Sequence, residues 1–315
     1  MTIKDTANIL KSFGSALIFC HQRPDGDTLS CAFALKKAYE RSGVKADVVC
    51  SDPVPKKYAD TGLFGETSLI ARDGYDGYVA VDCASSDMLA TNEKFFLTKP
   101  RTVVIDHHAT NTRFGKNNYV DCVSACAINV YRIIEAMGVT VDADIAETLL
   151  LGILTDTGSF GHSNTDPQTL RAAADLIDRG ADLVRLNRLL FKSQSRARSD
   201  LYLEVMSAMK FYHGDRFAII YTSQKMLDER GLTRADTEGF VDYPLTIGSV
   251  EVCAAVSEAA GNGYKISLRS KNIDVAEIAR LFGGGGHKNA SGFMLFGFLE
   301  DVFDKLVFTI ANYLD

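Results

Sequence analysis

Continuous hydrophobic runs and helix-like spacings alternate along the first half of the chain. The hydrophobic runs have the length of strands and carry few polar positions, as expected for parallel strands covered on both faces. We expect strands at Ala16–His21, Ala46–Ser51, Gly77–Cys83 and Thr102–His108. We expect helices at Asp27–Arg41, Ser124–Met137, Ala143–Leu154 and Pro167–Arg179. The pattern therefore predicts an α/β domain with a mainly parallel sheet.

The second half repeats this alternation on a smaller scale. A polar, arginine-rich segment around residues 181–210 has helical spacing and no strand signal, so we interpret it as a helical connector. Beyond it we expect three strands and two helices, at Arg216–Thr222, Val250–Ser257, Tyr264–Arg269, Val275–Phe282 and Leu299–Leu314. The predicted organisation is a catalytic domain over 1–185, a connector over 186–209 and a smaller α/β substrate-binding domain over 210–315, with a cleft between the two domains.

Length and charge narrow the range of functions. The chain has 315 residues and 46% hydrophobic composition, which suits two globular domains better than one. Its formal net charge of −6 argues against the broad basic surface that holds long nucleic acid. Any nucleic-acid substrate is therefore expected to be short or to be held at a local site.

The cysteines and the N-terminal sequence indicate a compartment. Seven cysteines lie mostly inside apolar runs, which predicts buried free thiols in a reducing environment rather than a disulfide framework. The first residues carry no signal-peptide pattern, and no apolar stretch approaches the roughly 20 residues of a membrane span. We expect a cytoplasmic protein without a membrane partner.

Acidic residues and histidines follow the predicted strands and one apolar helix. In an open parallel sheet the carboxyl ends of the strands meet at one edge, where ligands bind. Imidazole and carboxylate together suit Mn²⁺ and similar divalent ions. The candidate ligands are His21, Asp25, Asp27, Asp82, His107 and Asp156, and Asp106 and His108 flank His107. Because these residues come from four segments at similar positions, they favour two adjacent metal ions over independent structural roles.

Each of these groups also has an ordinary structural explanation. Asp25 and Asp27 are able to cap the helix that follows them, as aspartates often do. Asp82 fits a cap at the end of a strand, and the Asp-His-His triplet fits a surface turn. A helix C-terminus closed by Gly158 would explain Asp156. The metal hypothesis thus depends on the joint occurrence of the four groups.

A glycine-rich motif, Gly283-Gly-Gly-Gly-His287-Lys-Asn-Ala-Ser291-Gly292, stands out in the second half. Successive glycines allow backbone N–H groups to form an anion-binding concavity, with His287, Lys288 and Ser291 as further donors. Arg269 could clamp a phosphate with two hydrogen bonds. The simpler explanations are a flexible linker for the glycines and surface charge for the arginine. The motif lacks the ending of a Walker A loop.

With these motifs in this order, the chain resembles the DHH-family phosphoesterases that carry a DHH-associated C-terminal domain, and within them the branch of nanoRNases and pAp phosphatases. The resemblance covers nearly the whole chain. It is carried by His21-x3-Asp25-Gly-Asp27, Asp82, Asp106-His107-His108, Thr155-Asp156-Thr-Gly158, Arg269 and the Gly-Gly-Gly-His287-x2-Ala-Ser291-Gly292 motif.

The resemblance implies a role for each residue. One metal ion is assigned to His21, Asp25 and Asp82, and the other to Asp27, Asp82, His107 and Asp156, so that Asp82 bridges the two. Asp106 is expected to support His107, and His108 to face the scissile phosphate, which makes Asp82, Asp106 and His108 the catalytic set. The substrate's phosphate or terminal nucleotide is assigned to Arg269, Gly284, Gly285, Gly286, His287 and Ser291.

The resemblance also implies a reaction. Two divalent ions, Mn²⁺ with Mg²⁺ as the alternative, would activate a water molecule that attacks phosphorus in short oligonucleotides and in pAp. A phosphodiesterase for linear or cyclic dinucleotides and a non-catalytic nucleotide-binding regulator remain alternatives. The sequence departs from the family after Asp27, after Asp82 and at Gly161-His162, which leaves the substrate preference open. Whether the chain forms a homodimer is also open.

Overall fold

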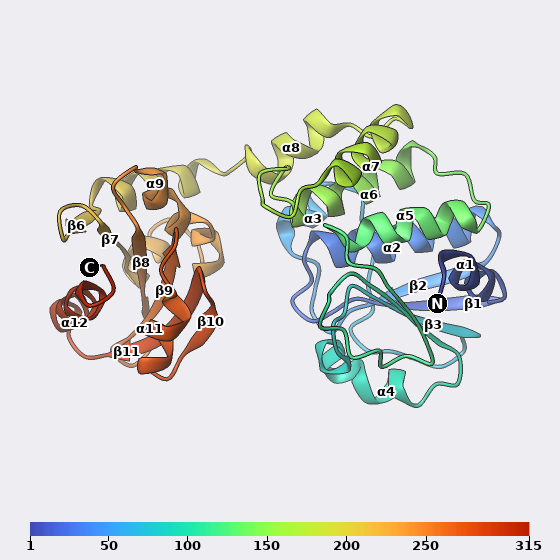
Figure 1. The fold of residues 1–315 in the computed structure, drawn as a ribbon, viewed down its shortest axis with the longest axis horizontal. Coiled ribbons are helices and arrows are strands. Elements are labelled where there is room, and N and C mark those ends of the chain that lie inside the picture. Colours follow the sequence, from blue (N-terminus) through green and yellow to red (C-terminus); the bar gives the residue numbers. More distant parts are fainter. Residues whose placement is uncertain (315) are drawn as a thin grey trace. The chain divides into compact units, whose positions relative to one another are not determined.

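The computed structural model describes residues 1–314, and the chain divides into two compact units, Met1–Ser193 and the residues from Gln194 onward (Figure 1). The first unit alternates strands with helices. Its strands are β1 Ser15–Phe19, β2 Lys45–Val49, β3 Gly77–Val81, β4 Thr102–Asp106 and β5 Asn117–Val120. Its helices are α1 Ile3–Lys11, α2 Gly26–Arg41, α3 Lys56–Ala59, the 3₁₀ helix η1 Ser86–Asn92, α4 Glu93–Leu97, α5 Cys126–Ala136, α6 Ala143–Asp156, α7 Pro167–Asp178 and α8 Leu183–Phe191.

The five strands of the first unit form one parallel sheet in the order β2-β1-β3-β4-β5. Successive side chains point to opposite faces, so Ile18 packs under α2 and α5 while Leu17 and Phe19 pack against the α4 side. α2 and α5 lie along one face and α4 on the other (Figure 1). Coverage of both faces explains the continuous hydrophobic runs, and the predicted α/β class with a parallel sheet is confirmed.

The strand ends differ from the prediction in a way that matters for the site. β1 ends at Phe19 and β3 at Val81, so His21 and Asp82 lie in the loops beyond the ladder instead of within it. The prediction did not include β5, whose sequence Asn-Asn-Tyr-Val is polar because it forms the edge of the sheet. The helix α1 was not predicted either.

The second unit contains a mixed sheet. Its strands are β6 Lys210–Tyr212, β7 Phe217–Thr222, β8 Val252–Ala259, β9 Gly263–Ser270, β10 Gly285–His287 and β11 Ala290–Phe296, in the order β10-β11-β9-β8-β7-β6. Its helices are α9 Arg196–Ser207, α10 Gln224–Asp228, η2 Arg234–Thr237, η3 Phe240–Thr246, α11 Val275–Leu281 and α12 Leu299–Ala311. Only β7 and β8 run parallel among the pairs of this described sheet.

The segment 186–209, predicted as a separate connector, is divided between the units. α8 belongs to the first unit, where Arg185 forms an ion pair with Glu147, and α9 begins the second.

Cys122 is exposed and every other cysteine is buried, and all seven are free. Among residues 1–314, no helix combines the length and the apolar character that crossing a membrane requires.

Candidate metal centre

The acids and imidazoles named from the sequence meet at the carboxyl edge of the parallel sheet. The Nε2 atom of His21 lies 3.6 Å from a carboxylate oxygen of Asp82, and Nε2 of His107 lies 3.4 Å from the other. Nε2 of His107 also lies 3.5 Å from Asp156. Loops after β1, β3 and β4 and the end of α6 thus bring together residues that are more than a hundred positions apart.

Asp25 caps a helix and also lies beside the imidazole of His21. Its Oδ1 atom accepts hydrogen bonds from the backbone N–H groups of Asp27 and Thr28 at 3.0 and 3.1 Å, so it is the N-cap of α2. The same oxygen lies 3.6 Å from Nε2 of His21. The imidazole is oriented from behind, because its Nδ1 atom lies 2.8 Å from the carbonyl oxygen of Gln22. The cap therefore fixes Asp25 next to His21.

Asp27 is fully buried and is held by a different helix. Its two carboxylate oxygens accept hydrogen bonds from the backbone N–H groups of Cys126 at 2.5 Å and Ala127 at 2.9 Å. These N–H groups form the first turn of α5, where the helix dipole stabilises negative charge. Asp27 thus joins the start of α2 to the start of α5.

Asp82 is the centre of the cluster. It is 3% exposed, and its Oδ1 atom is buried without a hydrogen-bond partner. Its backbone has a φ of 55°, in the left-handed region that aspartate tolerates better than most residues. Burial raises the pKa of this carboxyl, but the contacts with His107 and His21 outweigh burial and hold the pKa below its usual range. Nε2 of His107 is near this oxygen at 3.4 Å but makes no hydrogen bond to it, and a buried, charged oxygen in such surroundings is a group that a cation would satisfy.

The predicted support of His107 by Asp106 is wrong. Nδ1 of His107 lies 2.9 Å from the carbonyl oxygen of Val123, whereas Oδ1 of Asp106 accepts a hydrogen bond from Nδ1 of His108 at 2.8 Å. Asp106 lies two residues before His108, the spacing that places side chains on one side of an extended chain, and Nδ1 of His107 is already bound by Val123. The hydrogen bond to Asp106 raises the pKa of His108 above its ordinary value.

Asp156 shows how much negative charge the centre holds. Burial raises the pKa of this carboxyl, and the neighbouring Asp82 and Asp25 carboxylates raise it further, to about 7. Burial and the charge of Asp156 also raise the pKa of Asp27. Carboxylates that raise one another's pKa in this way are stabilised when a cation lies between them.

The donor set matches divalent metal ions. Within the described residues, ligand atoms of His21, Asp25 and Asp82 lie within 4.8 Å of one another, and so do those of Asp27, His107 and Asp156. The resemblance assigned Asp82 to both ligand groups, and Asp82 also lies within 4.8 Å of His107, a member of the second group. Carboxylate with imidazole is a donor set for Mn²⁺ and similar ions. The unsatisfied Asp82 oxygen makes the fit physically consistent.

The predicted substrate contacts lie in the second unit and are less tightly held. Arg269 lies on β9, where its Nη1 donates to the carbonyl oxygen of Leu268 at 3.0 Å and its Nε lies 3.4 Å from Asp242. The predicted glycine loop is partly a strand, since β10 pairs with β11 in an antiparallel hairpin. A β-carbon on Gly284 would lie 2.2 Å from the carbonyl oxygen of Gly292, so this glycine is needed for the close approach.

Two further predicted contacts of this hairpin, His287 and Ser291, have different surroundings. His287 is exposed at the end of β10. Ser291 is 6% exposed, and its hydroxyl donates to the carbonyl oxygen of Val275 at 2.5 Å. That hydrogen bond ties the hairpin to the start of α11. In this arrangement the Ser291 hydroxyl is occupied, whereas His287 is open to a ligand.

Some residues that hold the site were not identified from the sequence. Asn111 donates from Nδ2 to the carboxylate of Asp106 at 2.6 Å and to the carbonyl oxygen of Cys83 at 2.9 Å. Asn111 follows His108 by three residues, and a polar residue in a turn so close to the Asp-His-His triplet is a local sequence signal for such a role. Gly152 lies within the apolar helix α6, and an isolated glycine in a helix often indicates a packing constraint.

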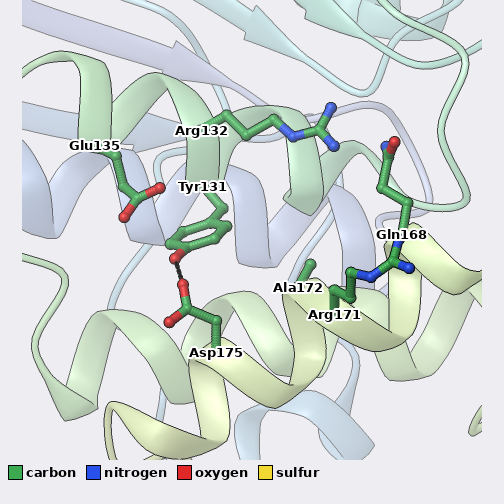
Figure 2. A pocket seen from close by; sticks show the side chains of 7 residues that line it. All are labelled: Tyr131, Arg132, Glu135, Gln168, Arg171, Ala172 and Asp175. Atoms are coloured by element: carbon green, nitrogen blue, oxygen red, sulfur yellow. Dashed lines mark hydrogen bonds between the residues drawn. The ribbon is translucent and has the colours of Figure 1, made fainter.

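A pocket elsewhere in the first unit contains none of these residues. It lies between α5 and α7, as Figure 2 shows, and is lined by Tyr131, Arg132, Glu135, Gln168, Arg171, Ala172 and Asp175. The hydroxyl of Tyr131 donates to Asp175, and Arg179 pairs with both Glu135 and Asp175. The carboxylates of Glu135 and Asp175 in this pocket are therefore neutralised by Arg179, in contrast to the carboxylates of the metal centre.

Comparisons with known proteins identify the family of the chain. Residues 15–153 match the model of the DHH family, N-terminal domain, and residues 216–314 match the DHHA1 domain. A relative from Thermus thermophilus, named "bifunctional oligoribonuclease and PAP phosphatase NrnA", is 32% identical, and the match covers 96% of this chain and 91% of the relative. The chain belongs to the DHH family.

Other similarities extend over the same length. A Streptococcus mutans relative, named "probable bifunctional oligoribonuclease and PAP phosphatase NrnA", is 26% identical over 94% of this chain and 95% of its own. The crystal structure of an exopolyphosphatase-related protein from Bacteroides fragilis has a TM-score of 0.85 and 23% identity, covering 99% of this chain and 96% of that chain. This structural similarity establishes that the fold is shared. The family expected from the sequence motifs is confirmed.

Proposed function

We propose that this DHH-family chain is a metal-dependent phosphoesterase that hydrolyses short oligonucleotides to nucleoside monophosphates and removes the 3′-phosphate of pAp. The observation that carries the proposal is the convergence of four aspartates and two imidazoles around the unsatisfied buried oxygen of Asp82. The names of the Thermus thermophilus and Streptococcus mutans relatives supply the substrate class. The net charge of −6 further supports a short substrate over a long strand.

The residues of the first unit would hold two divalent ions, for which we propose Mn²⁺. When bound, such ions stabilise charge on phosphoryl oxygens and lower the pKa of a water molecule. His21, Asp25 and Asp82 would hold one ion, and Asp27, His107 and Asp156 the other, with Asp82 between them. The carbonyl groups behind His21 and His107 keep Nε2 of each ring directed to the centre.

His108 would handle the phosphoryl group itself. Its Nδ1 is bound to Asp106, so Nε2 is the nitrogen that remains for a phosphoryl oxygen or the leaving oxygen. Asp106 favours the protonated imidazole, which allows His108 to donate a proton or a charged hydrogen bond from Nε2. Asn111 keeps the Asp106 carboxylate in place. The substitution Asp106→Asn therefore tests His108 through its orientation.

The second unit would recognise the phosphate or terminal nucleotide. Arg269 uses Nε and Nη1 within the protein and keeps Nη2 for an anion. Exposed His287 and the N–H groups of the glycines on the β10 edge are further donors. Buried free thiols support a reducing compartment, and we propose the cytoplasm.

One assay tests the proposal. Purified chain with Mn²⁺ is offered pAp, a dinucleotide, strands of about 5 and about 25 nucleotides, a cyclic dinucleotide and pyrophosphate at equal concentrations. We expect turnover of pAp, the dinucleotide and the shortest strand, and its loss when a chelator removes the metal. A preference for the long strand or for pyrophosphate would contradict the proposal. Turnover of none of them, with nucleotide binding intact, would indicate a non-catalytic regulator.

A further inference from the structure

α2 and α6 make contact through two glycines, one on each helix. A β-carbon built on Gly26 at the start of α2 would lie 2.4 and 2.5 Å from the side-chain atoms Cγ2 and Oγ1 of Thr155 on α6. A β-carbon on Gly152 of α6 would lie 2.6 Å from Oδ1 of Asp27 and 2.9 Å from Cβ of Ser30, both on α2. Each helix thus lacks a side chain where the other inserts one.

The atoms opposite these glycines have little freedom to move. Asp27 is bound through both carboxylate oxygens to the N–H groups of α5, and Cβ of Ala127 would lie 2.9 Å from a methyl group at Gly152. Thr155 is β-branched, and its hydroxyl donates to the carbonyl oxygen of Gly152 at 2.9 Å and of Leu151 at 3.2 Å. A methyl group at either glycine would therefore displace a helix instead of a flexible side-chain end.

The two contacts lie directly beside two proposed metal ligands. Gly26 precedes Asp27, and Thr155 precedes Asp156. Asp27 and Asp156 belong to the same ligand group, together with His107. The distance between α2 and α6 thus determines the separation of these two carboxylates. Metal ions of this kind require ligand oxygens at about 2.0–2.2 Å, so a small widening is enough to weaken binding.

We propose that Gly26 and Gly152 are positioning residues that set the separation of Asp27 and Asp156, and thereby the affinity of the ion held by Asp27, His107 and Asp156. The proposal rests on the metal centre of the proposed function. It assigns a role to two residues that have no side chain to coordinate an ion. The other ion, held by His21, Asp25 and Asp82, does not use α6 and is expected to keep its affinity.

The experiment is a Mn²⁺ titration of the full chain, with free Mn²⁺ followed by electron paramagnetic resonance. We expect the unsubstituted chain to bind two ions and Gly152→Ala to bind one of them about 10- to 100-fold more weakly, the usual effect of disturbing the support of a ligand. Alanine is the better helix former, so α6 itself is not weakened by this change. Asp156→Asn is the reference for loss of the same ion.

Gly65→Ala is the matched control, because a β-carbon there would lie 3.6 Å from its nearest neighbour, an ordinary contact with Phe33. It should bind both ions as the unsubstituted chain does. Two tight ions in Gly152→Ala, or an equal weakening of both, would overturn the inference while leaving the proposed function intact. An unsubstituted chain that binds no Mn²⁺ would overturn the proposed function and this inference with it.

Should Gly152→Ala fail to fold, Gly26→Ala and the double variant Gly26→Ala/Thr155→Ala decide the matter. Removing the Thr155 hydroxyl and methyl takes away the two atoms nearest to the new methyl group. Gly26 also adjoins Asp25, so we expect the single variant to weaken the ion held by Asp27, His107 and Asp156 and to affect the other ion less. The double variant should regain most of the lost affinity. A double variant that binds no better than the single one would overturn the inference.

Discussion

In the first unit the proposed ligands Asp27 and Asp82 are buried, whereas in the second unit the proposed substrate contacts Gly285, Gly286 and His287 lie on the exposed edge strand β10. Asp27 has no exposed surface and two hydrogen bonds to another helix. His287 is exposed at the end of a short edge strand. Precise geometry is thus maintained where negative charge is concentrated, whereas an exposed contact such as His287 can be substituted at little cost in stability.

Substitution of Asp82, which is buried at the centre of the ligand cluster, should have the largest effect. We expect Asp82→Asn to reduce kcat by about 10³-fold or more, because metal ions supply several kcal/mol of transition-state stabilisation and each 1.4 kcal/mol is tenfold. The fold should survive, since Oδ1 of Asp82 makes no hydrogen bond. Mn²⁺-dependent turnover of pAp and circular dichroism check this. Asp178→Asn, an exposed position on α7, is the control, and full activity of Asp82→Asn would refute the bridging role.

Substitution of Asp106 shows how much a buried residue that orients His108 contributes to turnover, compared with a metal ligand. Asp106→Asn removes the carboxylate that orients His108 and favours its protonated form, so we expect kcat to fall by about 10- to 100-fold with KM nearly unchanged. Steady-state kinetics on pAp give both constants, and a Mn²⁺ titration should still find two ions. Loss of an ion in this variant would mean that Asp106 acts on the metal ligands instead of on His108.

On the exposed side of the comparison, Arg269→Ala should raise KM instead of lowering kcat. A charge-assisted hydrogen bond contributes about 1.5–3 kcal/mol, so we expect a KM for pAp about 10- to 100-fold higher. Hydrolysis of a small aryl phosphodiester, which has no second phosphate to recognise, should hardly change. Lys265→Ala is the matched control, because Lys265 is exposed on the same strand. An equal loss on both substrates would place Arg269 in the chemistry.

Ser291, which is buried in the second unit, is expected to give the smallest effect. Its hydroxyl is bound to Val275, so Ser291→Ala should lower the free energy of unfolding by about 1 kcal/mol and leave the KM for pAp unchanged. Urea unfolding and steady-state kinetics measure the two quantities. A raised KM with unchanged stability would show that the hydroxyl contacts the substrate after all.

Much of the fold follows from local sequence because burial leaves a direct signal. The runs that form β1 to β4 are hydrophobic at consecutive positions, which both-face coverage requires. β5 and β10 leave no such signal, since one is a polar edge strand and the other consists of Gly-Gly-His paired through its backbone. Edge strands depend on a partner that is distant in the sequence, so local patterns do not reveal them.

In the site, too, contacts that follow from local sequence were predictable, whereas contacts with backbone groups of distant segments were not. Convergence of Asp82 and His107 was predictable, because both follow parallel strands whose ends must meet. The binding of Asp27 to α5 was not, because it depends on backbone N–H groups 99 and 100 residues away. The hydrogen bond between His108 and Asp106 is an intermediate case. The spacing of two residues between Asp106 and His108 is a local signal for this hydrogen bond.

The link between Asp27 and α5 also governs when the centre is completed during synthesis. The carboxylate of Asp27 remains without its partners until Cys126 and Ala127 have been added, and the ligand set is incomplete until Asp156 follows. At about 5–20 residues per second, translation separates Asp27 from Asp156 by several seconds to half a minute. A nascent chain therefore exposes the first ligand pair, His21 and Asp25, well before the second ion has a complete site.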